Sequence, residues 1–146
     1  MLARMRLALL ILACLCLVTL IACRSARQES RLQGTWRSNK DETVSAWRRN
    51  AVIPAKVIDR FESEALGKMS VTYSGRQVTS TTGSDWTEVS EYRVVESGDD
   101  FVVFDQFSDV YKRTLRWRVR FVKDGYWISN DEILKGYTEK FDLVSK

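Results

Sequence analysis

The sequence predicts a mainly β domain: a small antiparallel up-and-down barrel or half-barrel of about eight strands, with a helical insertion after the first strand. Three observations support this fold class. Segments rich in Val, Thr, Tyr, Phe and Trp, the residues that favour strands, recur from residue 69 to residue 144. Within residues 113–122, positions 115–121 alternate strictly between apolar and charged side chains. Turn signals separate the segments at Ser74-Gly75, Gly83-Ser84, Ser97-Gly98 and Asp124-Gly125.

The first 22 residues predict an N-terminal signal helix that precedes the domain. Arg4 and Arg6 supply a short positive region, and residues 7–22 are apolar and uncharged. A positive region followed by an apolar one is typical of a secretory signal peptide. An uncleaved membrane anchor remains the alternative, because residues 7–23 as a helix would extend about 26 Å, just short of the ~30 Å hydrocarbon core.

Leu20-Ile21-Ala22-Cys23 resembles the lipobox of bacterial lipoproteins. The resemblance implies cleavage before Cys23, a diacylglyceryl group on its sulfur, and acylation of the new amine, commonly with palmitate. Because Arg24 stands where inner-membrane lipoproteins tend to carry Asp, it also implies export and anchoring at the periplasmic face of the outer membrane. The expected organisation is a signal peptide (1–22), a lipidated Cys23 with a flexible tether (23–31) and a β domain (32–146).

Composition excludes several classes of function. Cys14 and Cys16 fall in the predicted signal peptide, so the domain is expected to fold without a disulfide. The chain has 23 Lys and Arg, and loss of Arg4 and Arg6 leaves 21 against 19 acidic residues. This near balance, together with export, argues against a nucleic-acid partner.

The chain contains no histidine. This removes Ser–His and Cys–His nucleophilic catalysis, histidine acid–base chemistry and imidazole metal sites. Two carboxylate pairs, Asp99-Asp100 and Asp131-Glu132, adjoin predicted turns, where acidic side chains are solvated. We therefore expect no catalytic residue, no metal and no cofactor, and a protein that is not an enzyme.

The elements follow in order from Leu32. Residues 32–39 predict a first strand around Trp36, and Asn39 with Glu42 fits a helix capping box. Residues 43–66 predict two short helices or one kinked helix, since Pro54 interrupts the pattern and suits the first turn of a second helix. Gly67 fits the helix end.

The later segments predict antiparallel strands, because short links force neighbours to run in opposite directions. Asp124-Gly125 predicts a type I′ hairpin, since these residues tolerate positive φ angles. In residues 113–122 the alternation predicts one buried and one solvated face. The expected strands are 69–73, 76–82, 85–96, 100–108, 112–123, 126–130 and 137–144.

Gly34-Thr35-Trp36 resembles the G-x-W motif on the first strand of lipocalin-like (calycin) proteins. The resemblance implies that Trp36 plugs the closed end of a barrel and that a basic residue stacks on it, with Arg113 and Lys140 as candidates. A helical stretch after the first strand is similar to the fatty-acid-binding branch, whose helices lid the barrel mouth. Residues 68–146 are few for that branch's later strands, so a smaller, filled barrel remains open.

Two groups of side chains are candidate sites. The five tryptophans either line a ligand pocket or fill a small core, and on the helical segment Trp47 either forms a lid or docks the helix. The arginines of residues 113–122 either bind anions or an acidic partner, or pair with carboxylates of neighbouring strands such as Glu88, Glu91 or Asp105. The candidates are Trp36, Trp47, Trp86, Trp117 and Trp127, and Arg116, Arg118 and Arg120.

Two functions are consistent with these features. The first expectation is a lipid-anchored accessory lipoprotein of the cell envelope that acts by contact with a protein partner. The alternative is a carrier or sensor of a small hydrophobic ligand or lipid. A cavity of roughly several hundred Å³ favours the carrier, whereas a filled barrel with an exposed patch favours the contact role.

Overall fold

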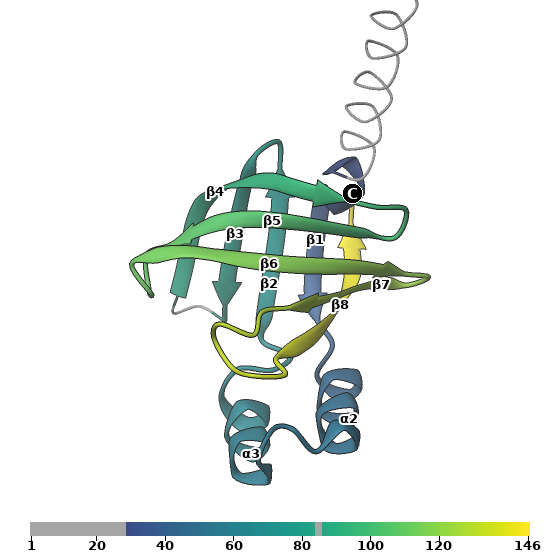
Figure 1. The fold of residues 1–146 in the computed structure, drawn as a ribbon, viewed down its shortest axis with the longest axis vertical. Helices are drawn as coiled ribbons and strands as arrows, with labels where there is room; N and C mark the ends of the chain where they lie inside the picture. The colour runs from purple at the N-terminus through teal and green to yellow at the C-terminus, as the bar shows by residue number, and fades with distance from the viewer. Residues whose placement is uncertain (1–28, 84–85) are drawn as a thin grey trace, which may run out of the picture.

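The computed structural model describes residues 29–83 and 86–146, which form a closed antiparallel barrel with two helices at one end (Figure 1). The predicted signal peptide, Cys23 and residues 24–28 lie outside the described residues. None of the helices in the described ranges is long and apolar enough to cross a membrane.

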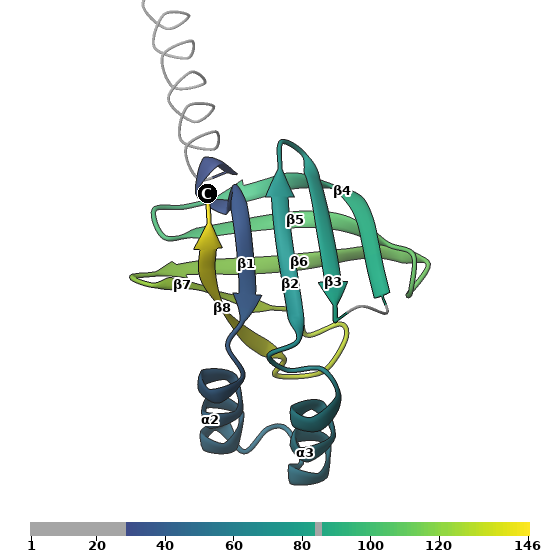
Figure 2. The ribbon, with the colours of Figure 1, turned by 180° about the vertical axis from the view of Figure 1, so that it is seen from behind.

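Each of the eight strands pairs with the next along the chain, and β8 pairs with β1 to close the barrel (Figures 1 and 2). The predicted mainly β fold class is confirmed. Because the sheet closes, the protein is a barrel rather than a half-barrel. Every strand end lies within two residues of its predicted place. The strands are β1 (Gly34–Ser38), β2 (Met69–Ser74), β3 (Gln77–Thr82), β4 (Trp86–Ser97), β5 (Phe101–Ser108), β6 (Arg113–Val122), β7 (Gly125–Ser129) and β8 (Thr138–Ser145).

The β6–β7 hairpin differs from the prediction in its turn. Val122 pairs with Gly125, so Lys123 and Asp124 form the connection and Gly125 already belongs to β7. Gly125 is not among the described residues with positive φ, so the predicted type I′ turn centred on Asp124-Gly125 is wrong. Gly125 instead allows close packing of β7 against β8, because a Cβ at this position would lie 2.0 Å from the Phe141 carbonyl oxygen.

The predicted alternation along β6 is confirmed. Leu115, Val119 and Phe121 are buried inside the barrel, and the three arginines between them are exposed on its outer face. Val119 and Phe121 belong to the main hydrophobic core, which fills the barrel end away from the helices. Trp36 belongs to this core: its Nε1–H donates to the Leu32 carbonyl at 2.6 Å, and its ring centre lies 4.8 Å from that of Tyr126.

The chain segment before β1 closes this end of the barrel. Residues 29–32 are helical, and Leu32 is fully buried. The Arg31 guanidinium lies 4.0 Å from the centre of the Phe121 ring, so a basic side chain at the Trp36 end stacks on Phe121. The two candidates for that role lie elsewhere: Arg113 pairs with Glu132 and Lys140 with Asp142.

The glycine of the G-x-W motif is required by the barrel seam. Gly34 has a φ of 122°, and a Cβ there would lie 2.5 Å from the Ser145 carbonyl oxygen. A larger residue would therefore strain the backbone and push β8 away from β1.

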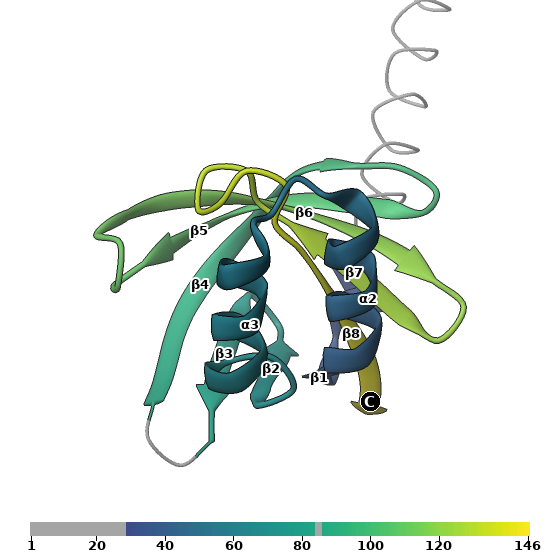
Figure 3. The same cartoon turned by 90° about the horizontal axis from the view of Figure 1, so that it is seen from below.

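The helical insertion consists of two separate helices, α2 (Lys40–Asn50) and α3 (Ala55–Glu64), which confirms the two-helix alternative. Asn39 caps α2 as predicted, accepting the Glu42 N–H at 3.0 Å, and α2 begins at Lys40 rather than at residue 43. Pro54 precedes α3. The helices lie side by side below the barrel end (Figure 3) and enclose a second small core of Trp47, Ile53, Ile58 and Leu66.

Helix α2 and its capping residue Asn39 are attached to β8 by four hydrogen bonds: one runs from Asn39 Nδ2 to Asp142 Oδ2 at 2.6 Å, and the other three involve the main chain of β8. The Lys140 N–H donates to the Thr43 hydroxyl at 3.0 Å, the Asn39 N–H donates to the Lys140 carbonyl at 2.7 Å, and Trp47 Nε1–H donates to the Thr138 carbonyl at 2.5 Å. The closed strand ladder and both cores lie within the described residues, so this part of the chain has the strand pairing and packing of a folded domain.

Candidate functional site

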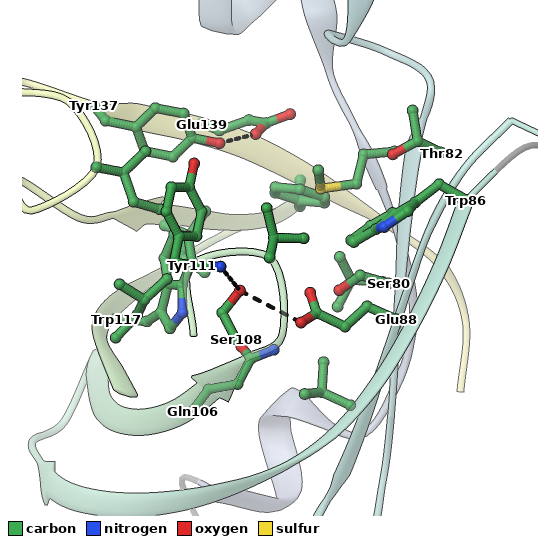
Figure 4. Close-up of a pocket in the computed structure, with 18 of the residues that line it drawn as sticks. Ser80, Thr82, Trp86, Glu88, Gln106, Ser108, Tyr111, Trp117, Tyr137 and Glu139 are labelled. Carbon is green, nitrogen blue, oxygen red and sulfur yellow. Dashed lines mark hydrogen bonds between the residues drawn. The ribbon is translucent and has the colours of Figure 1, made fainter. Parts of the chain in front are cut away.

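A cavity of about 440 Å³ opens at the helix end of the barrel (Figure 4). Tyr73, Tyr126 and Phe141 line it on the core side, and these three residues also belong to the main core. Its outer lining includes Trp86 and residues from the loops after β5 and β7. Phe61 is its lining residue from α3. One end of the barrel is thus packed and the other is hollow.

The hollow follows from side-chain size. At the closed end the inward positions carry Leu32, Trp36 and Phe121, which fill the space between the strands. Toward the helix end the cavity lining includes Ser80 and Thr82 on β3 and Ser108 on β5. Small inward side chains leave space that larger ones would fill, because a barrel of about eight strands is only just wide enough to be packed by its side chains.

The cavity wall is mostly aromatic and aliphatic. Eight of the 21 described lining residues are aromatic, and Figure 4 shows several of their rings around the space. The aromatic lining residues are Phe61, Tyr73, Trp86, Tyr111, Trp117, Tyr126, Tyr137 and Phe141. Such a wall suits an apolar ligand or the apolar part of a larger one.

A buried carboxylate lies in this wall. Glu139 is 2% exposed; its Oε1 accepts the Ser38 hydroxyl at 2.5 Å, and its Oε2 accepts the Tyr137 hydroxyl. Burial raises the pKa of Glu139 above its ordinary 4.5, although the two donated hydrogen bonds oppose the rise. Ser38 also accepts the Gly67 N–H at 2.9 Å, so the same network fixes the end of the helical insertion to the barrel.

A second carboxylate lies on another part of the wall. Glu88 of β4 accepts the Asp109 N–H at 2.6 Å and the Ser108 hydroxyl at 3.4 Å (Figure 4). Gln106, next along the inner face of β5, donates to the Ser90 hydroxyl at 2.7 Å. Among the described residues that line the cavity, Glu88 and Glu139 carry the charge, and neither Lys nor Arg belongs to the lining.

Two lining side chains keep buried donors without hydrogen bonds inside the described part of the chain: the Tyr126 hydroxyl and Trp117 Nε1. Burial raises the pKa of Tyr126 well above 10.0, so its hydroxyl stays protonated. The Tyr73 hydroxyl lies close enough to raise that pKa further, without a hydrogen bond of ordinary geometry between the two. Leaving a buried donor without a hydrogen bond costs about 1–3 kcal/mol of folding free energy. A polar ligand group that bonds to the donor would restore this free energy.

The five predicted tryptophans lie in different environments. Trp86 and Trp117 line the cavity, whereas Trp36 belongs to the core at the closed end. Trp47 is 1% exposed within the helix core and occupies the docking position rather than the cavity. Trp127 pairs with Arg120 on β6 and borders a hollow formed with Ala46 of α2, apart from the main cavity.

The arginine stripe is partly engaged. Arg116 makes two bonds to Asp105, Nε–Oδ1 at 2.8 Å and Nη2–Oδ2 at 3.0 Å, and its guanidinium lowers the pKa of that carboxyl. The Arg118 guanidinium lies 4.7 Å from the centre of the Phe101 ring. Pairing with a neighbouring strand, one of the two sequence interpretations, therefore holds for Arg116 with Asp105.

The sequence analysis missed Glu139 and the Tyr126 hydroxyl, and its suggestion that Glu88 pairs with the arginines of β6 is wrong, because Glu88 lies in the cavity wall and bonds to Ser108 and Asp109. The two-residue repeat of a β-strand could have shown that these acids point inward. Glu88 follows Trp86 by two positions, and Glu139 lies two positions from both Tyr137 and Phe141. Strand alternation places each acid on the side of its apolar neighbours. Acidic side chains that point into the interior of a barrel indicate a functional cavity.

Comparison of the chain with protein-family models, with curated proteins and with solved structures finds no match. Within residues 29–83 and 86–146, acidic side chains do not gather in groups of three or more that could hold a metal ion. The cavity and its lining are therefore the candidate functional site of this protein.

Proposed function

We propose that this protein is a lipid-anchored protein of the cell envelope whose barrel binds a small apolar or amphipathic molecule as a carrier or sensor. The observation that carries the proposal is the cavity of about 440 Å³ with its aromatic wall. Ligand sites commonly have volumes of roughly 300–1,000 Å³. The cavity thus meets the condition that favours the carrier over the contact role.

The anchoring part of the proposal rests on the sequence. The apolar segment before Ala22-Cys23 supports export and lipidation, and Arg24 supports the outer membrane. Two or more acyl chains would hold the protein stably at a bilayer. The absence of histidine supports a binding rather than a catalytic role.

Native mass spectrometry of residues 25–146, exported without the anchor, tests the binding function. We expect a reproducible added mass that disappears on denaturation. Ser80→Phe should abolish it by filling the cavity, whereas Thr79→Phe, the next residue along the strand and outside the cavity lining, should retain it. A bare protein that also fails to bind the neutral fluorescent probe N-phenyl-1-naphthylamine would contradict the proposal.

A further inference from the structure

The charges of the cavity restrict the polar end of its ligand, and this inference rests on the proposed binding function. The charged residues among its described lining are the carboxylates of Glu88 and Glu139. A ligand headed by a carboxylate or phosphate would bring a further negative charge into a site where water screens poorly. A cationic head would instead be attracted by both.

The aromatic rings around Glu139 favour the same sign of charge. Tyr137 holds the carboxylate through its hydroxyl, and its ring centre lies 6.4 Å from that of Trp117. The faces of tryptophan and tyrosine rings carry partial negative charge and attract ammonium groups. Rings together with a carboxylate thus form a surface suited to an organic cation.

The Tyr126 hydroxyl is a second, independent indication of a ligand. Tyr126 is fully buried and lines the cavity, and its hydroxyl has no hydrogen bond within the described residues. Its oxygen can accept an N–H from a ligand and its proton can be donated to a ligand oxygen, so the hydroxyl indicates a polar ligand group, and the sign of that group's charge follows from the carboxylates and rings.

We propose that the cavity binds amphiphiles whose polar end is an ammonium group, held by Glu139, the Tyr126 hydroxyl and the rings of Trp117 and Tyr137. Glu88 adds a second negative charge to the same cavity. An apolar chain then occupies the rest of the aromatic wall. The cavity should discriminate against amphiphiles with anionic heads.

Three probes of equal chain length separate the effect of the head from that of the chain. Dodecylamine, dodecanol and dodecanoate are each titrated at neutral pH, below micelle formation, against residues 25–146 loaded with N-phenyl-1-naphthylamine. We expect dodecylamine to displace the dye with a Kd at least about tenfold below that of dodecanoate, with dodecanol between them.

Charge-removing variants identify the groups responsible. Glu139→Gln should reduce the preference for dodecylamine over dodecanol at least about fivefold, and Glu88→Gln should reduce it less. Glu91→Gln is the matched control, because it removes the same charge from β4 at an exposed position outside the cavity lining. If Glu139→Gln does not fold, as judged by circular dichroism, the comparison of Glu88→Gln with Glu91→Gln makes the same test.

The outcomes distinguish the two proposals. Dye binding together with dodecanoate affinity equal to or above that of dodecylamine overturns the ammonium inference and leaves the binding function intact. A preference for dodecylamine that survives in both cavity variants also overturns the inference. Failure of the dye and of all three probes to bind overturns both proposals.

Discussion

Glu139 and Lys140 are consecutive residues of β8, and both are buried although strand alternation directs them to opposite sides of the barrel wall. Glu139 lines the cavity. Lys140 donates to Asp142 at 2.5 Å and lies 4.0 Å from Glu42 of α2, on the side where the helix packs. Buried charges are costly unless they are paired, so the lysine is compensated by acids whereas the glutamate has only hydroxyl donors.

This difference predicts a pH effect on stability. Because burial raises the pKa of Glu139, the folded protein holds its proton more tightly than the unfolded chain does. As pH rises above the ordinary value of 4.5, the unfolded chain loses this proton first and the free energy of unfolding falls. The Glu139→Gln variant has no carboxyl group to titrate at this position and should not lose this free energy. We therefore expect the free energy of unfolding of the variant, relative to wild type, to increase between about pH 4 and pH 7.

Urea unfolding at a series of pH values measures this effect. Glu91→Gln, whose carboxylate is exposed, is the control and should track wild type across the range. A stability difference between Glu139→Gln and wild type that is constant or shrinks with rising pH would contradict the expectation.

At the scale of elements, Trp47 fixes the helix pair to the barrel. Its ring centre lies 5.6 Å from Phe61 and 5.8 Å from Tyr137, and its Nε1–H is bonded to β8. We expect Trp47→Ala to lower the free energy of unfolding by about 3–5 kcal/mol. Dye affinity of the folded protein should change less, because Trp47 does not line the cavity.

Chemical denaturation and dye titration of the same samples separate the two effects. Trp127→Ala, which removes an equally large ring outside both cores, should cost less stability. Loss of dye retention in Trp47→Ala without loss of stability would restore the lid role for this tryptophan.

The outer face of β6 gives a second prediction at this scale. Arg116 is bonded to Asp105 through both oxygens, and Arg118 lies against a ring, so the stripe offers less free positive charge than its sequence suggests. We expect changing Arg116, Arg118 and Arg120 together to Gln to alter the affinity of residues 25–146 for anionic vesicles less than about twofold. A large loss in vesicle cosedimentation would instead favour an anionic partner for this face.

Strands and helices were predictable because their signals are local. The period of two along β6, the cap at Asn39 and the break at Pro54 each act within a few residues. Closure of the barrel was not decided by the sequence, because the β1–β8 seam joins residues far apart in the chain. The type I′ turn predicted at Asp124-Gly125 does not form for a related reason. Gly125 packs closely against β8, and this tertiary contact overrides the local turn preference.

The candidate site was less predictable than the fold. Tryptophan residues mark buried surface, but only tertiary packing decides whether that surface borders a core or a space. Trp86 and Trp117 line the cavity, whereas Trp36 and Trp47 fill cores. The burial of Lys140 was equally hidden, because it depends on α2 packing against β8.

At the scale of the whole molecule, a ligand inside the barrel contacts seven of the eight strands and α3, so its binding should stabilise the entire fold. A ligand that binds only the folded state at one hundred times its Kd raises the free energy of unfolding by about 2.7 kcal/mol. We expect this increase with dodecylamine in urea unfolding of wild type. Ser80→Phe should show none, and an equal increase in that variant would place the ligand outside the cavity.

The chain reaches β1 at the end of the barrel away from the helices (Figure 1). The cavity opens at the opposite end, where Phe61 of α3 lines it. With the proposed lipid on Cys23, five residues separate this anchor from Glu29, and a fully extended chain from Cys23 to Glu29 spans about 20 Å. A lipid at this position would therefore hold the packed end near the anchoring bilayer, with the opening facing away from it. The cavity would then exchange its ligand with the aqueous compartment, or with a partner on the far side of that compartment. The membrane that anchors the protein would be the surface least able to deliver a ligand to the cavity.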